Sequence, residues 1–260
     1  MRQDGVLWIA AGLLVLMTTP VRAAEEARVE WDIVGGVGLG VTELKFTEKL
    51  DADPSFNTYQ FFGSIGYDKA YATLNYADTL SDENVSEEDE IGEASRKDID
   101  LTFGYRLTDH WTVFAGYKDG ETELDLRVRD TDIVQNEYYR EDGWYAGVSR
   151  AFRLGRAGTI NLSAAYIKFD SDLRFTEGVE DDEEEEEDEP TEFDDLEGKY
   201  SGDSDGYSVG VSWVIPVGQK AAVRAQYKIN DYDLEVRADG QKFTPDQRLS
   251  YFDLTLLYAF

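Results

Sequence analysis

The sequence contains no cysteine, and this absence excludes disulfide bonds, thiolate metal sites and a lipid-modified amino-terminal cysteine. Histidine is almost as scarce, because His110 is the only one in the sequence. Proline is limited to 5 residues, whereas glycine and tyrosine are abundant. This balance favours long strands over disordered chain.

Beyond the amino terminus the sequence also lacks an apolar run long enough to form a membrane helix. The apolar run at residues 6–17 follows the positive Arg2 and precedes the small-residue site at residues 21–23, which is the order of an export signal. We therefore predict a signal peptide over residues 1–23 and a mature protein over residues 24–260. The alternative is a retained anchor helix, for which this run is short.

Basic residues are few, with 25 lysines and arginines against 55 aspartates and glutamates and a net charge of -30. Nucleic acid is therefore not an expected partner. Such a composition suggests an acidic soluble protein. However, a membrane barrel shows an apolar side chain to lipid only at every second position, and its polar loops mask this signal.

Alternation of apolar and polar residues runs through most of the chain. It is clearest at the carboxy terminus, where every second residue is apolar or aromatic: Phe252, Leu254, Leu256, Tyr258 and Phe260. Similar rows occupy nine earlier segments: residues 29–41, 59–67, 70–76, 99–107, 111–117, 144–152, 160–166, 207–215 and 223–229. Each row predicts a strand with one apolar face.

The connections between these ten segments alternate in length. Tight turns follow the second, fourth, sixth and eighth segments, and longer charged connections follow the others, including acidic loops at residues 81–97 and 171–205. Short turns at one rim and long loops at the other are typical of outer-membrane barrels. We predict an all-β fold: a transmembrane, antiparallel, up-and-down β-barrel of ten strands. A soluble lipocalin-like barrel would turn the apolar rows inward and would bury the charges of the opposite faces.

Three local features lead to narrower expectations. The apolar parity switches at Leu124 and Leu126, which indicates either a bulge or a strand that continues above the lipid. Arg150 falls on the lipid side, where it could snorkel near an interface. The inward glycines at positions 36, 38 and 40 are expected to make room for bulky neighbours.

Together, these features resemble the small outer-membrane β-barrel proteins of Gram-negative bacteria. The resemblance is one of pattern over the whole mature chain. It implies a location in the outer membrane, in contact with lipid and lipopolysaccharide. It also implies that the barrel-assembly machinery recognises the carboxy-terminal row as an assembly signal: Phe252, Leu254, Leu256, Tyr258 and Phe260. The group includes proteases, lipid-modifying enzymes, channels, adhesins and inert scaffolds, so the resemblance leaves function open.

The enzymes of that group need residues that this sequence does not supply. Omptin-type proteases use a histidine with acidic partners at the outer rim, and the barrel lipid hydrolases pair a serine with a histidine. His110 falls in a predicted periplasmic turn, at the opposite end. We therefore expect no catalytic residue and no cofactor.

Metal binding has only weak candidates. These are the carboxylates of the longest acidic run: Glu183, Glu184, Glu185, Glu186, Glu187 and Asp188. The run is either a solvated, self-repelling loop or a surface that gathers calcium or magnesium loosely. Asp203, Asp205 and Gly206 look like part of a calcium loop, but Ser201 and Ser212 stand where ligands would be needed.

The lumen is the remaining candidate region. Inward positions are expected to form a polar network of Asp32, Arg106, Lys118, Arg224, Lys228 and Asp253. A ten-stranded barrel is narrow enough for such side chains to nearly fill it. The leading hypothesis is a non-enzymatic envelope protein that presents acidic loops, and the alternative is a narrow porin-like channel for ions or small polar solutes.

Overall fold

The computed structural model describes residues 31–46, 54–81, 83–86, 90–128, 134–176, 198–238 and 241–260. The predicted signal peptide and the acidic run at residues 183–188 lie outside the described residues. Among the residues described, no helix is long and apolar enough to cross a membrane.

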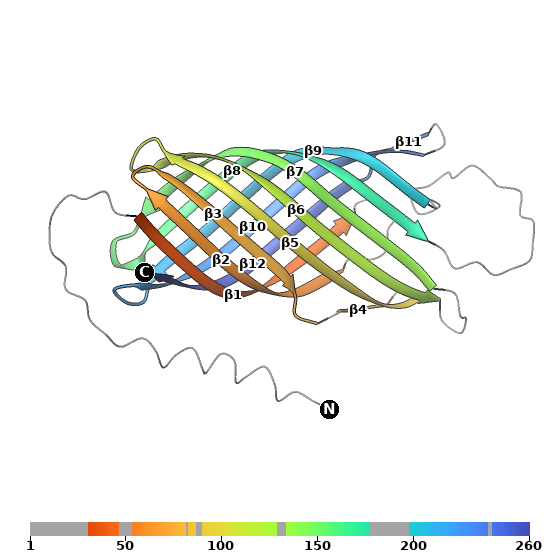
Figure 1. The fold of residues 1–260 in the computed structure, drawn as a ribbon, viewed down its shortest axis with the longest axis horizontal. Helices are drawn as coiled ribbons and strands as arrows, with labels where there is room; N and C mark the ends of the chain where they lie inside the picture. The colour runs from red at the N-terminus through yellow and green to blue at the C-terminus, as the bar shows by residue number, and fades with distance from the viewer. Residues whose placement is uncertain are drawn as a thin grey trace, which may run out of the picture. The chain divides into compact units, whose positions relative to one another are not determined.

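Within these ranges, ten long antiparallel strands close into a barrel, as predicted (Figure 1). The strands are β1 (Trp31–Phe46), β2 (Ser55–Tyr67), β3 (Ala70–Thr79), β5 (Glu90–Arg106), β6 (Trp111–Val128), β7 (Val134–Arg153), β8 (Thr159–Thr176), β9 (Gly198–Pro216), β10 (Ala221–Ala238) and β12 (Asp246–Ala259). Two short strands, β4 (Glu83–Ser86) and β11 (Gln241–Phe243), pair with β5 and β10. Closure depends on β12, which pairs with β1 on one side and with β10 on the other.

The tight turns gather at one end of the barrel. They span residues 68–69, 107–110, 154–158 and 217–220, and the third contains the 3-10 turn Gly155–Ala157. The start of β1 and the end of β12 lie at the same end (Figure 1). In outer-membrane barrels this is the periplasmic end. We call the opposite end the cell-surface end.

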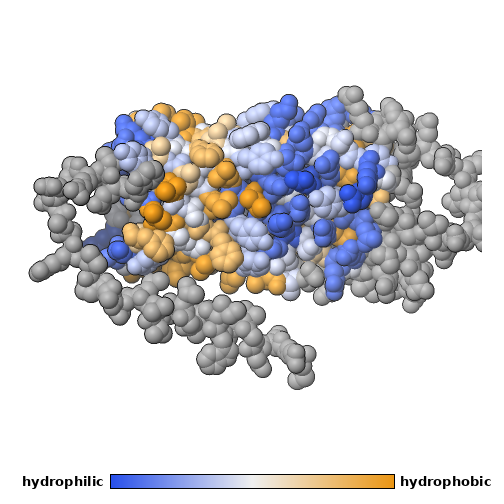
Figure 2. Space-filling view, viewed as in Figure 1, coloured by the Kyte–Doolittle hydropathy of each residue, from blue (hydrophilic) through white to orange (hydrophobic). Residues whose placement is uncertain are grey.

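An apolar band surrounds the half of the barrel near the periplasmic end. Its outward side chains include Leu39 and Leu254, which are 59% and 50% exposed. Figure 2 shows this band as a mainly apolar surface that gives way to hydrophilic residues toward the cell-surface end. Large apolar side chains are exposed on each of the ten long strands and need a hydrocarbon solvent, so this band is the membrane-spanning part.

The apolar face turns inward in the half near the cell-surface end. In β6, Val113 and Ala115 face outward, whereas Leu124 is buried inside and Glu123 and Asp125 are exposed. The pairing of β6 with β5 and β7 runs without interruption through this switch. The strand therefore continues above the lipid, and the alternative of a bulge is wrong.

This extension corrects the predicted loop boundaries. β5 already begins at Glu90, β8 continues to Thr176, and β9 begins at Gly198, so parts of the predicted loops at 81–97 and 171–205 are strand. The reason is that outward positions such as Asp172 and Asp203 face water and are charged. A strand above the membrane therefore lacks the outward apolar row that marks a strand within it.

Glycines on the inner face make room for side chains of neighbouring strands, as expected. A Cβ atom at Gly36 would lie 2.7 Å from Leu257 Cδ2, and one at Gly116 would lie 2.3 Å from the Tyr145 ring. Small residues here allow bulky side chains to fold across the adjacent strand in a narrow lumen.

Candidate functional site

The lumen holds a cluster of charged side chains, which we call the charged belt. It consists of Arg96, Asp98, Asp100, Lys118, Glu141, Arg224, Lys228 and Asp253. These residues occupy inward positions on β5, β6, β7, β10 and β12. Buried charges in such a space must be paired, and the belt meets this need in two groups.

The first group is centred on Asp98. Arg96 donates to both of its carboxylate oxygens, from Nε at 3.0 Å and from an Nη atom at 2.9 Å. The Lys118 ammonium lies 2.9 Å from the same carboxylate. Arg96 also donates to Thr122 Oγ1 at 2.6 Å, and the Tyr232 hydroxyl donates to Glu141 at 2.6 Å. This group is nearly inaccessible to solvent and is held by charge-assisted hydrogen bonds.

The second group lies nearer the periplasmic end. Arg224 donates to Asp253 at 3.2 Å and to Thr255 at 3.2 Å. Asp100 accepts hydrogen bonds from Thr102 at 2.9 Å and from the Tyr145 hydroxyl. Lys228 Nζ lies 3.8 Å from Asp100, which is beyond hydrogen-bond distance. Lys228 is therefore the most loosely paired cation of the belt.

A polar cavity of about 70 Å³ lies between the two groups. Its wall combines belt residues with the amides of Gln60, Asn75 and Gln226 and with Tyr251. In this measure one water needs about 10–15 Å³, so the cavity has room for about five waters or one small ion.

An apolar cluster fills the lumen on the cell-surface side of the belt, and we call it the apolar plug. It contains Leu44, Phe56, Ala94, Leu124, Tyr139, Leu173, Phe175, Leu234, Val236 and Leu249. These side chains come from eight of the ten barrel strands and are at most 8% exposed. The close packing of these buried side chains leaves no room for a wide aqueous path through this half.

The lumen toward the periplasmic end is more open. Its inward residues include Ser64, Thr73, Ser163 and Ser212, which are all partly exposed. Phe62 shares this space, with the Arg224 guanidinium 4.7 Å from its ring. Solvent therefore reaches the belt region from the periplasmic side.

The structure separates the six residues that were predicted to form the lumen network. Lys118, Arg224, Lys228 and Asp253 lie in the charged belt. Asp32 is exposed, and Arg106 is exposed at the periplasmic rim, where it donates to the Asp68 carbonyl. These two residues are therefore not part of the belt.

Sequence reasoning missed Arg96, Asp98 and Glu141. Arg96 falls in the predicted loop at residues 81–97, and Glu141 lies outside the predicted strands. The sequence did contain one indication of their direction. Residues two apart in a strand share a face, so Arg96 and Asp98 continue the inward face of Asp100. This spacing has meaning only because β5 extends above the lipid and includes both residues.

Tyrosines lie at the edge of the apolar band nearer the cell-surface end, where they hydrogen-bond to carboxylates just beyond the band. Asp78 accepts from Tyr59 at 2.9 Å and from Tyr76 at 2.7 Å, and Asp142 accepts from Tyr117. This arrangement is the aromatic girdle expected at a membrane interface.

Arg150 lies on the opposite edge of the band. It is exposed on the lipid side, as predicted, and its guanidinium lies 5.3 Å from the Trp111 ring and 4.8 Å from the Phe152 ring. Packing against aromatic rings at the rim lets its charge reach the interface.

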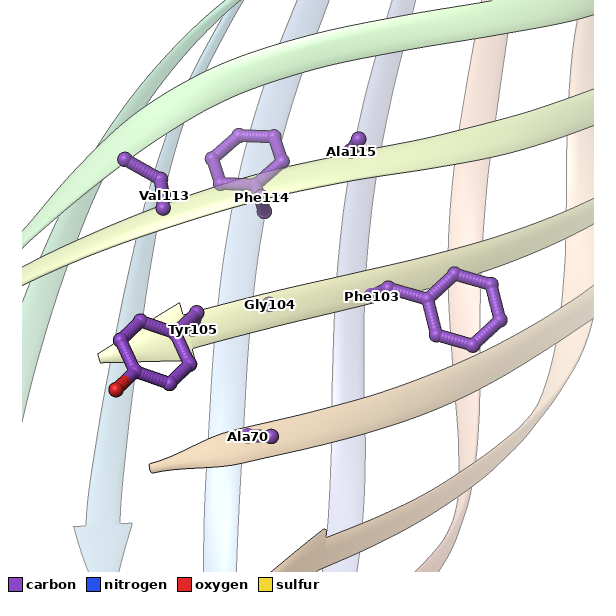
Figure 3. A pocket seen from close by; sticks show the side chains of 7 residues that line it. All are labelled: Ala70, Phe103, Gly104, Tyr105, Val113, Phe114 and Ala115. Carbon is purple, nitrogen blue, oxygen red and sulfur yellow. The ribbon is translucent and has the colours of Figure 1, made fainter. Parts of the chain in front are cut away.

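The lipid-facing wall also has an apolar hollow of about 410 Å³. Figure 3 shows Phe103, Tyr105 and Val113 around it, with the small Ala70 and Ala115 between them. The hollow lies on the apolar band, so hydrocarbon chains of the membrane are its natural filling.

The predicted assembly signal lies on the lipid-facing side of β12. Phe252, Leu254 and Leu256 are 46%, 50% and 39% exposed, and Phe260 is 75% exposed. The Tyr258 and Phe260 rings pack edge to face, 5.2 Å apart.

The remaining candidates are catalytic or metal-binding. His110 is exposed in the turn between β5 and β6, at the periplasmic end. The described residues contain no group of three or more histidine, aspartate or glutamate side chains placed to hold a metal ion. Asp203 and Asp205 both lie on β9 and are exposed, so they do not form a loop.

Comparisons with known proteins support the fold alone. No family model matches the sequence, and no curated relative was found. Among solved structures, the outer membrane protease OmpT from Escherichia coli matches with a TM-score of 0.53 at 13% identity, over 90% of this chain and 99% of that one. The translocator domain of autotransporter NalP from Neisseria meningitidis matches with a TM-score of 0.51 at 8% identity, over 88% of each chain. With its closed ten-stranded sheet and lipid-facing apolar band, this chain has the fold of the bacterial outer-membrane β-barrel proteins.

Proposed function

We propose that this barrel is a non-enzymatic envelope protein that presents an acidic surface to the medium and whose lumen does not conduct. The observation that carries the proposal is the apolar plug, to which eight strands contribute. A pore would need a continuous polar lining, and the plug interrupts it above a belt whose charges are already paired.

The positions of potential catalytic groups support the non-enzymatic part. The only histidine of the sequence, His110, lies at the periplasmic end, opposite to the cell-surface end. No other imidazole could serve as a general base, and the belt carboxylates are engaged by arginine, lysine and tyrosine.

Planar-bilayer recording tests the closed lumen. The full chain should give no large, stable conductance steps, whereas a Phe56→Ser and Leu249→Ser double variant should open transiently, because both residues are fully buried in the plug. Heat-modifiable gel migration checks that the variant is folded. Large steps from the unaltered protein would contradict the proposal. Small steps whose ion preference changes in Lys228→Met would favour the narrow channel instead.

Gathering of divalent cations is the second part of the proposal, and a ladder of carboxylates on the outer wall favours it. Five acidic residues lie directly opposite one another across β6 to β10: Asp119, Asp142, Asp170, Asp203 and Glu235. Neighbouring strands are about 4.8 Å apart, and like charges facing each other at that spacing repel. Arg140 offsets part of this repulsion, at 3.0 Å from Asp119 and 3.9 Å from Asp142.

The crowding of carboxylates continues on the neighbouring wall. Asp233 faces Asp205 on one side and Asp246 on the other, and a shared hydrogen bond with Asp246 raises the pKa of Asp233. Carboxylate oxygens are the ligands that calcium and magnesium prefer. We infer a loosely held layer of divalent ions along this wall, which the heat-unfolding midpoint with and without magnesium would test.

A further inference from the structure

Hydrogen bonding around the lumen cavity is unbalanced even though the charges on its wall are equal in number. Three acidic and three basic residues line it: Asp98, Asp100, Asp253, Lys118, Arg224 and Lys228. Each acid accepts hydrogen bonds or ion pairs from at least two side chains. In contrast, two of the basic residues have N–H groups without an acceptor, so the cavity has an excess of hydrogen-bond donors.

The acids are well supplied. Asp98 is engaged by Arg96 and Lys118. Asp100 accepts from Thr102 and Tyr145, and Asp253 accepts from Arg224 and Thr255. The cavity therefore offers little to a cationic ligand.

The spare donors are on β10. Arg224 is nine-tenths buried, and its Nε–H has no hydrogen-bond partner. Lys228 has its ammonium 3.8 Å from Asp100, and its side chain remains 25% exposed. Gln226 lies between them on the same inward face and also lines the cavity. A buried guanidinium N–H without an acceptor is costly, so an acceptor is expected to occupy this space.

Other unpartnered polar atoms lie away from the cavity wall. The buried Glu141 Oε1 and the Asn230 side chain also lack partners, but neither residue lines the cavity. The combination of spare donors and free space therefore occurs at Arg224, Gln226 and Lys228.

Access and size limit the ligand. The apolar plug closes the cell-surface side, whereas partly exposed serines and threonines line the periplasmic side. A cavity of about 70 Å³ suits a ligand of a few atoms.

We propose that the lumen is a blind, periplasm-facing binding site for a small oxyanion, a carboxylate or a phosphate, held by Lys228, Gln226 and Arg224. Oxyanions accept charge-assisted hydrogen bonds from ammonium and guanidinium groups, which is the chemistry that this wall leaves unused. The site is independent of the acidic outer wall.

Nitrogen-15 NMR of the full chain in detergent micelles tests the site through the Arg224 Nε–H signal, which is assigned by its loss in Arg224→Lys. Inorganic phosphate and acetate, added separately, should each shift this signal in a saturable way, and sodium chloride at the same ionic strength should not. Tighter binding of one of the two oxyanions would show whether the natural ligand is a carboxylate or a phosphate. Absence of a saturable shift with both probes would mean that water alone fills the cavity, and the proposal would fail.

Matched variants locate the binding. Lys228→Met should weaken the apparent affinity about tenfold or more, the loss expected for one charge-assisted hydrogen bond. Lys97→Met, whose lysine pairs with Glu121 at 3.5 Å on the exposed outer wall, should leave affinity unchanged. Where Lys228→Met does not fold, Gln226→Leu removes a donor while keeping every charge, and it should also weaken binding. Unaltered binding in a folded variant of either kind would overturn the proposal, and this outcome would leave the conductance result unaffected.

Discussion

Arg96 shows how the barrel tolerates charge in its interior. Its side chain is 2% exposed, and it donates to Asp98 twice and to Thr122 once. A buried ion pair of this kind contributes little over an apolar filling, but removal of one partner leaves a buried charge unpaired. We therefore expect the loss of Arg96 to destabilise the protein mainly because Asp98 would be left as a buried charge with fewer partners.

Replacement of Arg96 by methionine should lower the free energy of unfolding by about 3–5 kcal/mol, because the Asp98 carboxylate would lose its bidentate partner. Urea unfolding followed by tryptophan fluorescence would measure this loss. The matched control is Arg248→Met on the outer wall, where the single pair with Asp231 is about half exposed on both sides. The control should be much less destabilised, because water screens an exposed pair. Equal losses in the two variants would show that the belt is not an energetically distinct environment.

At the scale of elements, the sequence predicted the membrane-spanning halves of the strands and not their extensions. In β6, the outward row of Val113, Ala115 and Tyr117 was recognisable because lipid demands apolar side chains. Beyond it, water on the outside and the plug on the inside reverse the pattern, as Glu123 and Leu124 illustrate. In β6 the alternation predicted either a bulge or a strand that continues above the lipid, whereas the extensions of β5, β8 and β9 were predicted as loops.

The candidate site was predictable in part for the same reason. Arg224, Lys228 and Asp253 lie opposite clear apolar rows, so their inward direction followed from parity. Their partners could not be deduced, because pairing across the lumen depends on the shear of the closed barrel. The contact of Lys118 with Tyr251 illustrates this, since it joins residues 133 positions apart.

The terminal strand suggests a test of assembly. The Phe260 amide donates to the Ile33 carbonyl at 3.0 Å, so the last residue helps to join β12 to β1. We expect Phe260→Ala to slow insertion several-fold without changing the final fold, because its exposed ring adds little to packing. Pulse-chase labelling followed by heat-modifiable migration would measure this rate.

Phe61→Ala is the control, because Phe61 is also a lipid-facing phenylalanine, 53% exposed on β2. It should assemble at the normal rate if position on the terminal strand is what matters. Equal slowing of both variants would point to general lipid-facing hydrophobicity and against a terminal signal.

At the scale of the whole molecule, the barrel divides into an apolar half that faces lipid and a hydrophilic half that stands in water (Figure 2). The carboxylate ladder lies on the hydrophilic half, where its charges face one another across five strands. Counterions are therefore part of the energetics of the folded protein, in addition to its internal contacts.

Magnesium or calcium at millimolar concentration should raise the heat-unfolding midpoint, and a chelator should reverse the change. A gain of about 1 kcal/mol corresponds to about 2–4 °C for a protein of this size. An Asp170→Asn and Asp203→Asn double variant should respond less, because it interrupts the ladder at its centre. An equal rise with sodium chloride at matched ionic strength would indicate simple screening and contradict divalent gathering.

The uninterrupted pairing of β6 through the change of parity has a further consequence for the surrounding bilayer. The boundary between apolar and acidic surface is fixed in a closed sheet, which cannot shorten or slide one strand to suit a thicker or thinner membrane. Any hydrophobic mismatch must therefore be absorbed by a tilt of the whole barrel or by the lipids, which thin or thicken around it. Without a tilt, the protein sets the local height of the membrane in which it lies.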